Sequence, residues 1–226
     1  MKARLDDFPE LRRDLLGALK SLGASSIADL AEKHGVTPEA VRQQLAVLER
    51  DGWVRRRRAS VTGKPGRPTA AYELTPAAEE LFPKAYDALA VELLDAIADQ
   101  VGPQGLEKIL KSLAEARVGR FAAQVEGLPL EKRLEKLKDL YLADDSHMSV
   151  EKAGKTIRLV ERNCPFYGVA SRRPALCSVT VNALSRLLGR RVTREERFQE
   201  GHGRCAFVVH RGEPAPRSFT YEPPLP

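Results

Sequence analysis

Residues 37–58 of this chain read TPEAVRQQLAVLERDGWVRRRR, and this stretch decides the fold of the N-terminal part. Thr37 is a typical helix N-cap, and Pro38 follows it in the first helical position, where a missing N–H costs nothing. Val41, Leu45 and Leu48 lie at i, i+4 and i+7, which predicts the buried face of a helix. The Asp-Gly pair after the helix ends it, and a strand is expected to begin with Trp-Val and continue into four arginines.

The preceding residues predict two further helices. Residues 11–22 carry an apolar stripe, and Ser25 or Ser26 can cap a helix over residues 27–33. A tight turn at residues 34–36 joins this helix to the one that begins after Thr37. This order predicts a helix-turn-helix, whose second helix enters the major groove of DNA.

The outward face of that second helix supplies candidate DNA contacts, namely Thr37, Glu39, Arg42 and Gln43. Arg42 suits a guanine edge and Gln43 suits an adenine edge, although each residue is equally suited to a phosphate contact. Gln44 lies beside the buried stripe, which favours a structural role.

A basic ribbon follows the helix. Between residues 55 and 67 there are six basic residues and no acidic one: Arg55, Arg56, Arg57, Arg58, Lys64 and Arg67. Residues 72–74 predict the return strand, so that the segment forms a wing whose arginine run neutralises phosphates and whose Arg67 reaches the minor groove. We therefore expect binding to a double-stranded DNA operator. The alternative is a winged helix that binds another protein.

The composition narrows the functional class. The chain has 226 residues, a formal net charge of +6 and a pI of about 9.3, which permits a polyanionic partner. No apolar run is long enough to span a membrane, and the N-terminus lacks the apolar region of a signal peptide, so we expect a cytoplasmic protein without a membrane partner. The sequence contains no phosphate-binding glycine loop, no nucleophile elbow and only four histidines, which argues against an enzyme.

The middle of the chain predicts helices. One helix is expected to start at Thr75-Pro76 and to end at Gly102-Pro103, with apolar residues every four positions and a kink or interruption at Pro83. Two more are expected at residues 104–126 and 130–142. These helices either pack within the chain or form the interface of a homodimer, which would pair two DNA half-sites. We favour the homodimer.

The C-terminal part predicts a small β-β-α-β-β unit, so that the fold class is α+β. Strands are expected at residues 148–150, 155–160, 192–198 and 205–209, and a helix is expected from Cys177 to Gly189. The predicted domains are a winged helix-turn-helix at 1–76, a helical dimerisation region at 77–145, a cysteine-containing domain at 146–213 and a proline-rich tail at 214–226.

All three cysteines lie in the C-terminal part: Cys164, Cys177 and Cys205. An odd number of thiols in a cytoplasmic protein disfavours a disulfide framework and indicates a soft-metal or iron–sulfur site. Each cysteine lies at the boundary of a predicted element, where side chains can converge. Cys177 at a helix N-terminus also gains thiolate character from the helix dipole.

The spacing of the cysteines does not identify the metal. It matches neither a zinc ribbon nor a ferredoxin. Three thiolates leave one position open on a cubane cluster or on tetrahedral zinc, and His202 is the nearest candidate for a fourth ligand, with a solvent-exposed turn histidine as the alternative. Remoter candidates are Asp144, Asp145, His147 and Tyr167.

The chain resembles the SufR-type regulators, winged-helix proteins related to the ArsR and DeoR groups. The resemblance spans nearly the whole chain and is carried by the following segments: 66–68 (GRP), 72–75 (YELT), 81–83 (LFP), 163–166 (NCPF), 174–177 (PALC), 187–189 (LLG) and 201–207 (GHGRCAF). Some members carry a further cysteine between the last two, which is missing here, and His202 stands where relatives often have aspartate.

The resemblance implies a homodimer that holds one 4Fe–4S cluster per subunit, with Cys164, Cys177 and Cys205 at the ligand positions. It further implies that the cluster-loaded form binds an operator and represses iron–sulfur cluster assembly genes, and that cluster loss or oxidation releases them. The alternatives are a regulator with a structural zinc or thiol-redox site, and one that senses a small molecule.

Overall fold

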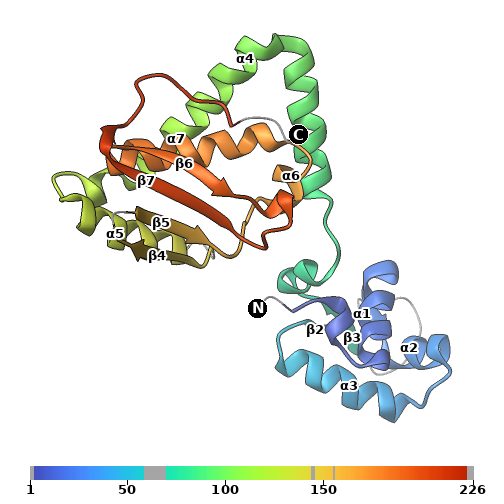
Figure 1. The fold of residues 1–226 in the computed structure, drawn as a ribbon. Coiled ribbons are helices and arrows are strands. Elements are labelled where there is room, and N and C mark those ends of the chain that lie inside the picture. The colour runs from blue at the N-terminus through green and yellow to red at the C-terminus, as the bar shows by residue number, and fades with distance from the viewer. Residues whose placement is uncertain (1–2, 59–69, 144–145, 155, 223–226) are drawn as a thin grey trace. The chain divides into compact units, whose positions relative to one another are not determined.

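The computed structural model describes residues 3–58, 70–143, 146–154 and 156–222, and it divides into two compact units at residues 84 and 85. The elements of the first unit are η1 (Leu5–Asp7), α1 (Glu10–Leu22), β1 (Ser25–Ser26), α2 (Ile27–His34), α3 (Pro38–Arg50), β2 (Val54–Arg58), β3 (Ala70–Leu74) and η2 (Pro76–Leu81). Figure 1 labels the main helices and strands of both units.

The predicted helix-turn-helix elements are present in the first unit. Ser26 caps α2 by accepting a hydrogen bond from the backbone N–H of Asp29, and Thr37 caps α3 by accepting one from the N–H of Ala40. Between the two helices, Gly35 has a φ of 63°, the left-handed conformation that favours glycine at a helix end. The turn therefore directs α3 away from α2 within three residues.

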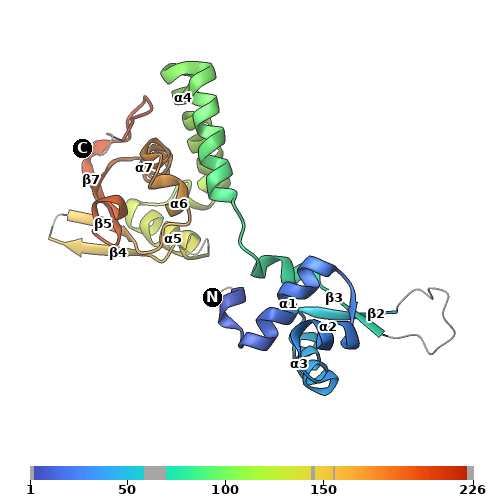
Figure 2. The ribbon, with the colours of Figure 1, turned by 90° about the vertical axis from the view of Figure 1, so that its right-hand side faces the viewer.

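The core of the first unit confirms the predicted buried faces. Val41, Leu45 and Leu48 of α3 are fully buried against leucines of α1 and α2. Strand β3 pairs antiparallel with both β2 and β1, and Figure 2 shows β2 and β3 side by side. The two-residue strand β1 was not predicted, because Ser25 and Ser26 read as cap residues and two residues show no alternation.

The second unit contains the remaining elements. They are α4 (Tyr86–Val125), α5 (Leu130–Ala143), β4 (Met148–Ala153), β5 (Thr156–Glu161), α6 (Tyr167–Ala170), η3 (Pro174–Leu176), α7 (Cys177–Leu188), β6 (Arg190–Glu196), η4 (Phe198–Glu200) and β7 (Cys205–Pro214). The strands form one antiparallel sheet in the order β4-β5-β7-β6. Side chains of α4, α5, α7 and the sheet share one apolar core.

The helix expected from Thr75-Pro76 to Gly102-Pro103 is interrupted at Pro83, as the sequence predicted. The structure has the short helix η2, an extended residue at Phe82, and a new helix that begins at Tyr86. The cause is Pro83, which cannot donate a helical hydrogen bond and keeps the residue before it extended. The predicted break at Gly102 is confirmed, because Gly102 has a φ of 65° and divides α4 into two halves.

The predicted order β-β-α-β-β in the second unit agrees with the observed strands and α7. The strand expected at residues 192–198 is displaced, since β6 spans Arg190–Glu196 and Phe198 lies in the helical turn η4. The helices expected in a separate region at 77–145 belong to the second unit from Tyr86 onward, where Phe121 of α4 and Leu137 of α5 are buried in its core.

The first half of α4 exposes an apolar stripe. Tyr86, Leu89, Leu93 and Val101 follow helical spacing along it and have 68, 53, 53 and 46% of their surface exposed. Large apolar side chains gathered on one face in this way mark an interaction surface more often than scattered ones do.

Candidate functional site

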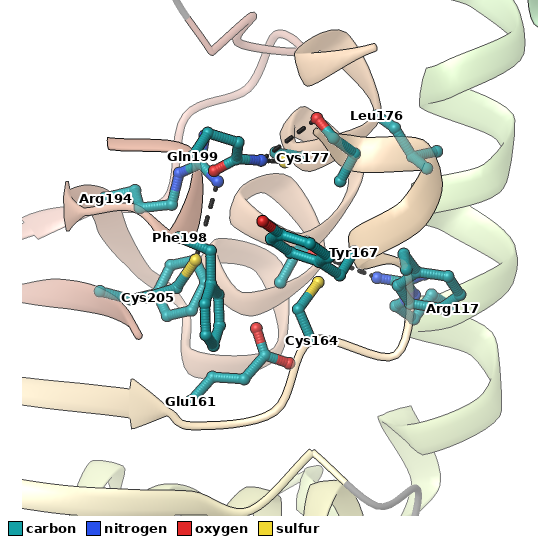
Figure 3. A pocket seen from close by; sticks show the side chains of 14 residues that line it. Arg117, Glu161, Cys164, Tyr167, Leu176, Cys177, Arg194, Phe198, Gln199 and Cys205 are labelled. Atoms are coloured by element: carbon teal, nitrogen blue, oxygen red, sulfur yellow. Dashed lines mark hydrogen bonds between the residues drawn. The ribbon is translucent and has the colours of Figure 1, made fainter. Parts of the chain in front are cut away.

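The three cysteines, far apart in the sequence, line one pocket of the second unit. Cys164 follows the end of β5, Cys177 is the first residue of α7, and Cys205 is the first residue of β7. Figure 3 shows the side chains on the wall of this pocket, which is partly open to solvent. The expectation that element boundaries bring the cysteines together agrees with this geometry.

Strand pairing positions one side of the pocket. In the register of β5 and β7, Glu161 stands directly opposite Cys205, two residues beyond the pair Leu159 and Phe207. Because residues two apart on a strand share a face, Glu161 points into the unit with buried Ile157 and Leu159. The carboxylate therefore lies in the same pocket as the thiols, where Figure 3 shows it beside Cys164.

Hydrogen bonds to nearby residues position Cys164 and Cys177. The backbone carbonyl of Cys164 accepts a hydrogen bond of 3.1 Å from the N–H of Tyr167, which closes the turn into α6. The Gln199 side-chain amide donates both to Cys177 Sγ at 3.5 Å and to the carbonyl of Ala170 at 3.2 Å. Gln199 thereby connects the start of α7 with the end of α6.

Two arginines supply the positive charge near the pocket. Arg117 of α4 donates to Thr180 Oγ1 at 2.8 Å and stacks over the ring of Phe166 at 4.9 Å. Arg194 of β6 has only 2% of its side chain exposed, pairs with Glu222 at 2.9 Å, and points Nη1 toward Cys205 Sγ at 3.9 Å. Its Nη2 is buried without a hydrogen-bond partner in the described part of the chain.

The C-terminal segment is tied to this wall. Glu222, the partner of Arg194, also lies 3.5 Å from Arg197, and its backbone N–H donates to Ser178 of α7. The backbone of Thr220 exchanges hydrogen bonds with the side chain of Asn182. Residues that were predicted as part of a proline-rich tail therefore contribute a charge to the surroundings of the cysteines.

Burial in the pocket favours the protonated forms of Cys164, Cys205 and Glu161. Burial raises the pKa of the Cys164 thiol to about 12, and the nearby Glu161 adds to the effect. Burial also raises the pKa of Cys205, and it raises the pKa of Glu161 to about 7 although Arg117 and Arg194 oppose the change. A cationic group bound here would displace these protons, since thiolates and carboxylates ligate metals in their ionised forms.

The predicted fourth ligand, His202, lies outside the residues that line this pocket. Its ring is 43% exposed, and Nδ1 accepts a hydrogen bond of 3.1 Å from the backbone N–H of Arg197. Of the remoter candidates, Tyr167 lines the pocket, His147 does not, and Asp144 and Asp145 fall outside the described residues.

Five polar side chains on the pocket wall were missed by the sequence reasoning: Arg117, Glu161, Thr180, Arg194 and Gln199. For Glu161 the sequence does contain a signal, because it continues an alternation in which Ile157 and Leu159 point inward. Nothing local in the sequence marks the other four, which come from α4, α7, β6 and η4. Within the described ranges, no group of three or more His, Cys, Asp or Glu residues is close enough to hold a single metal ion.

The structure places the candidate DNA contacts of α3 on its surface. Arg42 and Gln43 are exposed, and Arg42 forms an ion pair with Glu39. Thr37 serves as the helix cap. The structural role expected for Gln44 is supported, because its side-chain oxygen accepts a hydrogen bond of 2.7 Å from Arg12 of α1.

The arginines of β2 are exposed and partly paired. Arg55 and Arg57 both contact Glu73 of β3, at 2.8 and 3.1 Å, and Arg56 contacts Glu49 of α3 at 3.1 Å. Arg58 belongs to β2, and its side chain is outside the described residues, as are Lys64 and Arg67. Two carboxylates therefore face three arginines, which leaves a net positive charge on this ribbon.

No family model matches the chain, and no curated protein matches it. Two solved structures are similar to parts of it. A cysteine-to-serine mutant of ZitR from Lactococcus lactis is 20% identical with a TM-score of 0.28, over 48% of this chain and 73% of its own. NMB1585, a MarR family regulator from Neisseria meningitidis, is 17% identical with a TM-score of 0.27, over 62% of this chain and 82% of its own. Likeness at this level carries no inference about function.

In the part of the chain that the structure describes, no helix combines the length and the apolar character needed to cross a membrane.

The raised pKa of Glu161 predicts a pH-dependent stability for the chelator-treated protein. The folded pKa of about 7 lies above the ordinary value of 4.5, so the folded state keeps a proton that the unfolded chain has lost. Stability is then full below pH 4.5 and falls as the pH rises through 7, by about 3 kcal/mol at most. We expect Glu161→Gln to be more stable than the wild type at pH 8 and to differ little at pH 4.

Urea unfolding followed by far-UV circular dichroism at the two pH values measures this difference. The matched control is Glu151→Gln on β4, whose carboxylate is 43% exposed and pairs with Arg162. Equal pH dependence of the Glu161 variant and the wild type would contradict the prediction.

Proposed function

We propose that this chain is a DNA-binding transcription regulator that senses an iron–sulfur cluster held by Cys164, Cys177 and Cys205. The observation that carries the proposal is the convergence of three cysteines from separate elements on one pocket, in a chain whose other unit has helix-turn-helix elements and a basic ribbon. The function is regulatory rather than catalytic.

The donor set fits a cluster. Thiolates are the ligands that iron–sulfur clusters take, and three of them line one pocket here. In a 4Fe–4S cluster each thiolate binds its own iron atom, so the cysteines are held apart around a larger group. When bound, the cluster would supply a redox-active and oxidant-sensitive centre.

The polar groups around the cysteines also support an iron–sulfur cluster. Arg194 Nη2 and Gln199 Oε1 are buried without partners on the described pocket wall, which leaves polar groups to face a bound group. Hydrogen bonds donated by groups such as Arg194 Nη2 tune the sulfur ligands of iron–sulfur centres. A thiol-redox switch is disfavoured, because burial raises the pKa of Cys164 and Cys205 and a reactive cysteine needs a lowered one.

In this proposal α3 enters the major groove, where Arg42 and Gln43 face base edges or phosphates, and the arginines of β2 contact the backbone. The cysteines connect the end of β5 with the starts of α7 and β7. Loss of the cluster would free these three chain segments from one another. In keeping with the resemblance to SufR-type regulators, we propose repression of cluster-assembly genes by the loaded homodimer.

The cluster is tested by anaerobic purification with visible spectroscopy and analysis for iron, sulfide and zinc. We expect about four irons and four sulfides per chain for the wild type. Cys177→Ser should lose the colour and the cluster-dependent affinity for DNA while keeping its far-UV circular dichroism. Ser171→Ala, outside the pocket wall, is the control. A colourless wild type with one zinc, or with no metal after reconstitution, would rule out the cluster.

Phosphate contacts by the wing are tested through the salt dependence of DNA binding. Removal of one contacting arginine by Arg57→Ala should weaken binding to all sequences alike and lower the slope of log K against log salt by about 1. Arg211→Ala, which removes an exposed arginine from the second unit, provides the matched control. Titration of a labelled duplex at several salt concentrations gives the slope. An unchanged slope for Arg57→Ala would count against a wing contact at this position.

The homodimer is tested at the exposed stripe of α4. If Leu89 and Leu93 are buried between two subunits, replacing both with glutamate should raise the dissociation constant of the dimer by at least about 100-fold. The reason is the free energy that burial of two leucine side chains usually contributes to association. Analytical ultracentrifugation measures the dissociation constant. Leu142→Glu, a change at a similarly exposed leucine of α5, controls for nonspecific effects. A dimer that survives the double substitution would exclude this stripe as the interface.

A further inference from the structure

The pocket contains a buried carboxylate at a position where strand alternation calls for an apolar residue. Glu161 continues the inward face formed by Ile157 and Leu159, and only 6% of its surface is exposed. Burial of a carboxyl group without hydrogen bonds is costly, so such groups are normally paired or bound to a metal. A leucine or valine would fill this position of the sheet at no such cost.

Neighbouring side chains leave Glu161 without a direct partner. In the described part of the chain, no hydrogen bond or ion pair joins its carboxylate to another side chain. The two arginines near it make their hydrogen bonds and ion pairs with other residues, since Arg117 donates to Thr180 and Arg194 pairs with Glu222. The carboxylate therefore remains available to a group bound in the pocket.

The backbone places this carboxylate among the thiols. Glu161 is the direct cross-strand partner of Cys205, and residues in this relation have Cβ atoms about 4.5–5.5 Å apart. Cys164 lies three residues further along the same chain segment, and Figure 3 shows the Glu161 carboxylate beside the Cys164 side chain. The position of Glu161 next to Cys205 therefore follows from the register of β5 and β7.

We propose that Glu161 is the fourth ligand of the cluster, with one carboxylate oxygen on the iron atom that the three cysteines leave open. This inference rests on the proposed function, since it requires a cluster on Cys164, Cys177 and Cys205. On binding, Glu161 gives up its proton and coordinates as a carboxylate. His202, the ligand suggested by the sequence, lies in an exposed turn and hydrogen-bonds to the backbone of Arg197.

The assignment has a consequence for sensing. Iron in thiolate sites is held by soft ligands, whereas a carboxylate is a hard oxygen ligand better suited to other metals and oxidation states. An iron atom held by Glu161 would therefore exchange more readily than the iron atoms held by the three cysteines. Through this ligand Glu161 would make the cluster sensitive to iron supply and to oxidants.

The test compares the full-length wild type with Glu161→Gln and Glu161→Cys, each reconstituted anaerobically with iron enriched in the Mössbauer-active isotope. In the wild type we expect about one iron in four to have the signature of oxygen ligation. Glu161→Cys should keep the cluster and make all its irons alike. Glu161→Gln should lose one iron to a chelator at least about tenfold faster than the wild type and accumulate the three-iron form, seen by electron paramagnetic resonance.

Two further variants complete the comparison. Glu151→Gln makes the same change on the adjacent strand outside the pocket and should match the wild type. His202→Ala tests the competing ligand. The assignment would be overturned if Glu161→Gln kept the Mössbauer signal of the wild type, or if His202→Ala lost the signal of the oxygen-ligated iron. Either outcome would leave the cluster itself in place. Absence of any cluster on the wild type would refute both the assignment and the proposed function. Circular dichroism of the metal-free variants reports their folding.

Discussion

The antiparallel pairing of β5 with β7 is the constraint on which the candidate site depends. This register sets Glu161 opposite Cys205 and aligns Leu159 with Phe207 in the core below them. A shift by one residue would turn each of these side chains to the opposite face of the sheet. Because Leu159 and Phe207 are almost fully buried, such a shift would expose the core, so packing of the apolar residues also fixes the polar ones.

The rest of the pocket is built onto this pair of strands. Arg194 of β6 stands opposite Phe207 of β7, so it shares the inward face and reaches Cys205, where its pairing with Glu222 holds it. Helix α7 packs in the same core and presents Cys177 from its first turn. The sheet and one helix end thus bring together cysteines that are separated by up to 41 positions in the sequence, counting from Cys164 to Cys205.

The sequence by itself determined the elements whose signals are local. The cap at Thr37, the turn at Gly35 and the break at Gly102 depend on a few neighbouring residues, and each was predictable from them. The clustering of the three cysteines in one part of the chain likewise pointed to a thiolate site. The interruption at Pro83 was predictable in the same way. The prediction failed at Phe198, where the strand-like alternation continues but the chain forms the helical turn η4.

Only the tertiary structure decided which polar residues surround the thiols. Arg117, Arg194 and Gln199 come from three elements whose meeting depends on packing and strand order, and no spacing in the sequence records that. His202 was favoured because it lies three residues from Cys205. In the structure the chain turns at Gly203, and the His202 ring accepts a hydrogen bond from the backbone N–H of Arg197. Proximity along the chain is a poor guide at a turn, whereas strand register brings Glu161, 44 positions before Cys205, directly opposite it.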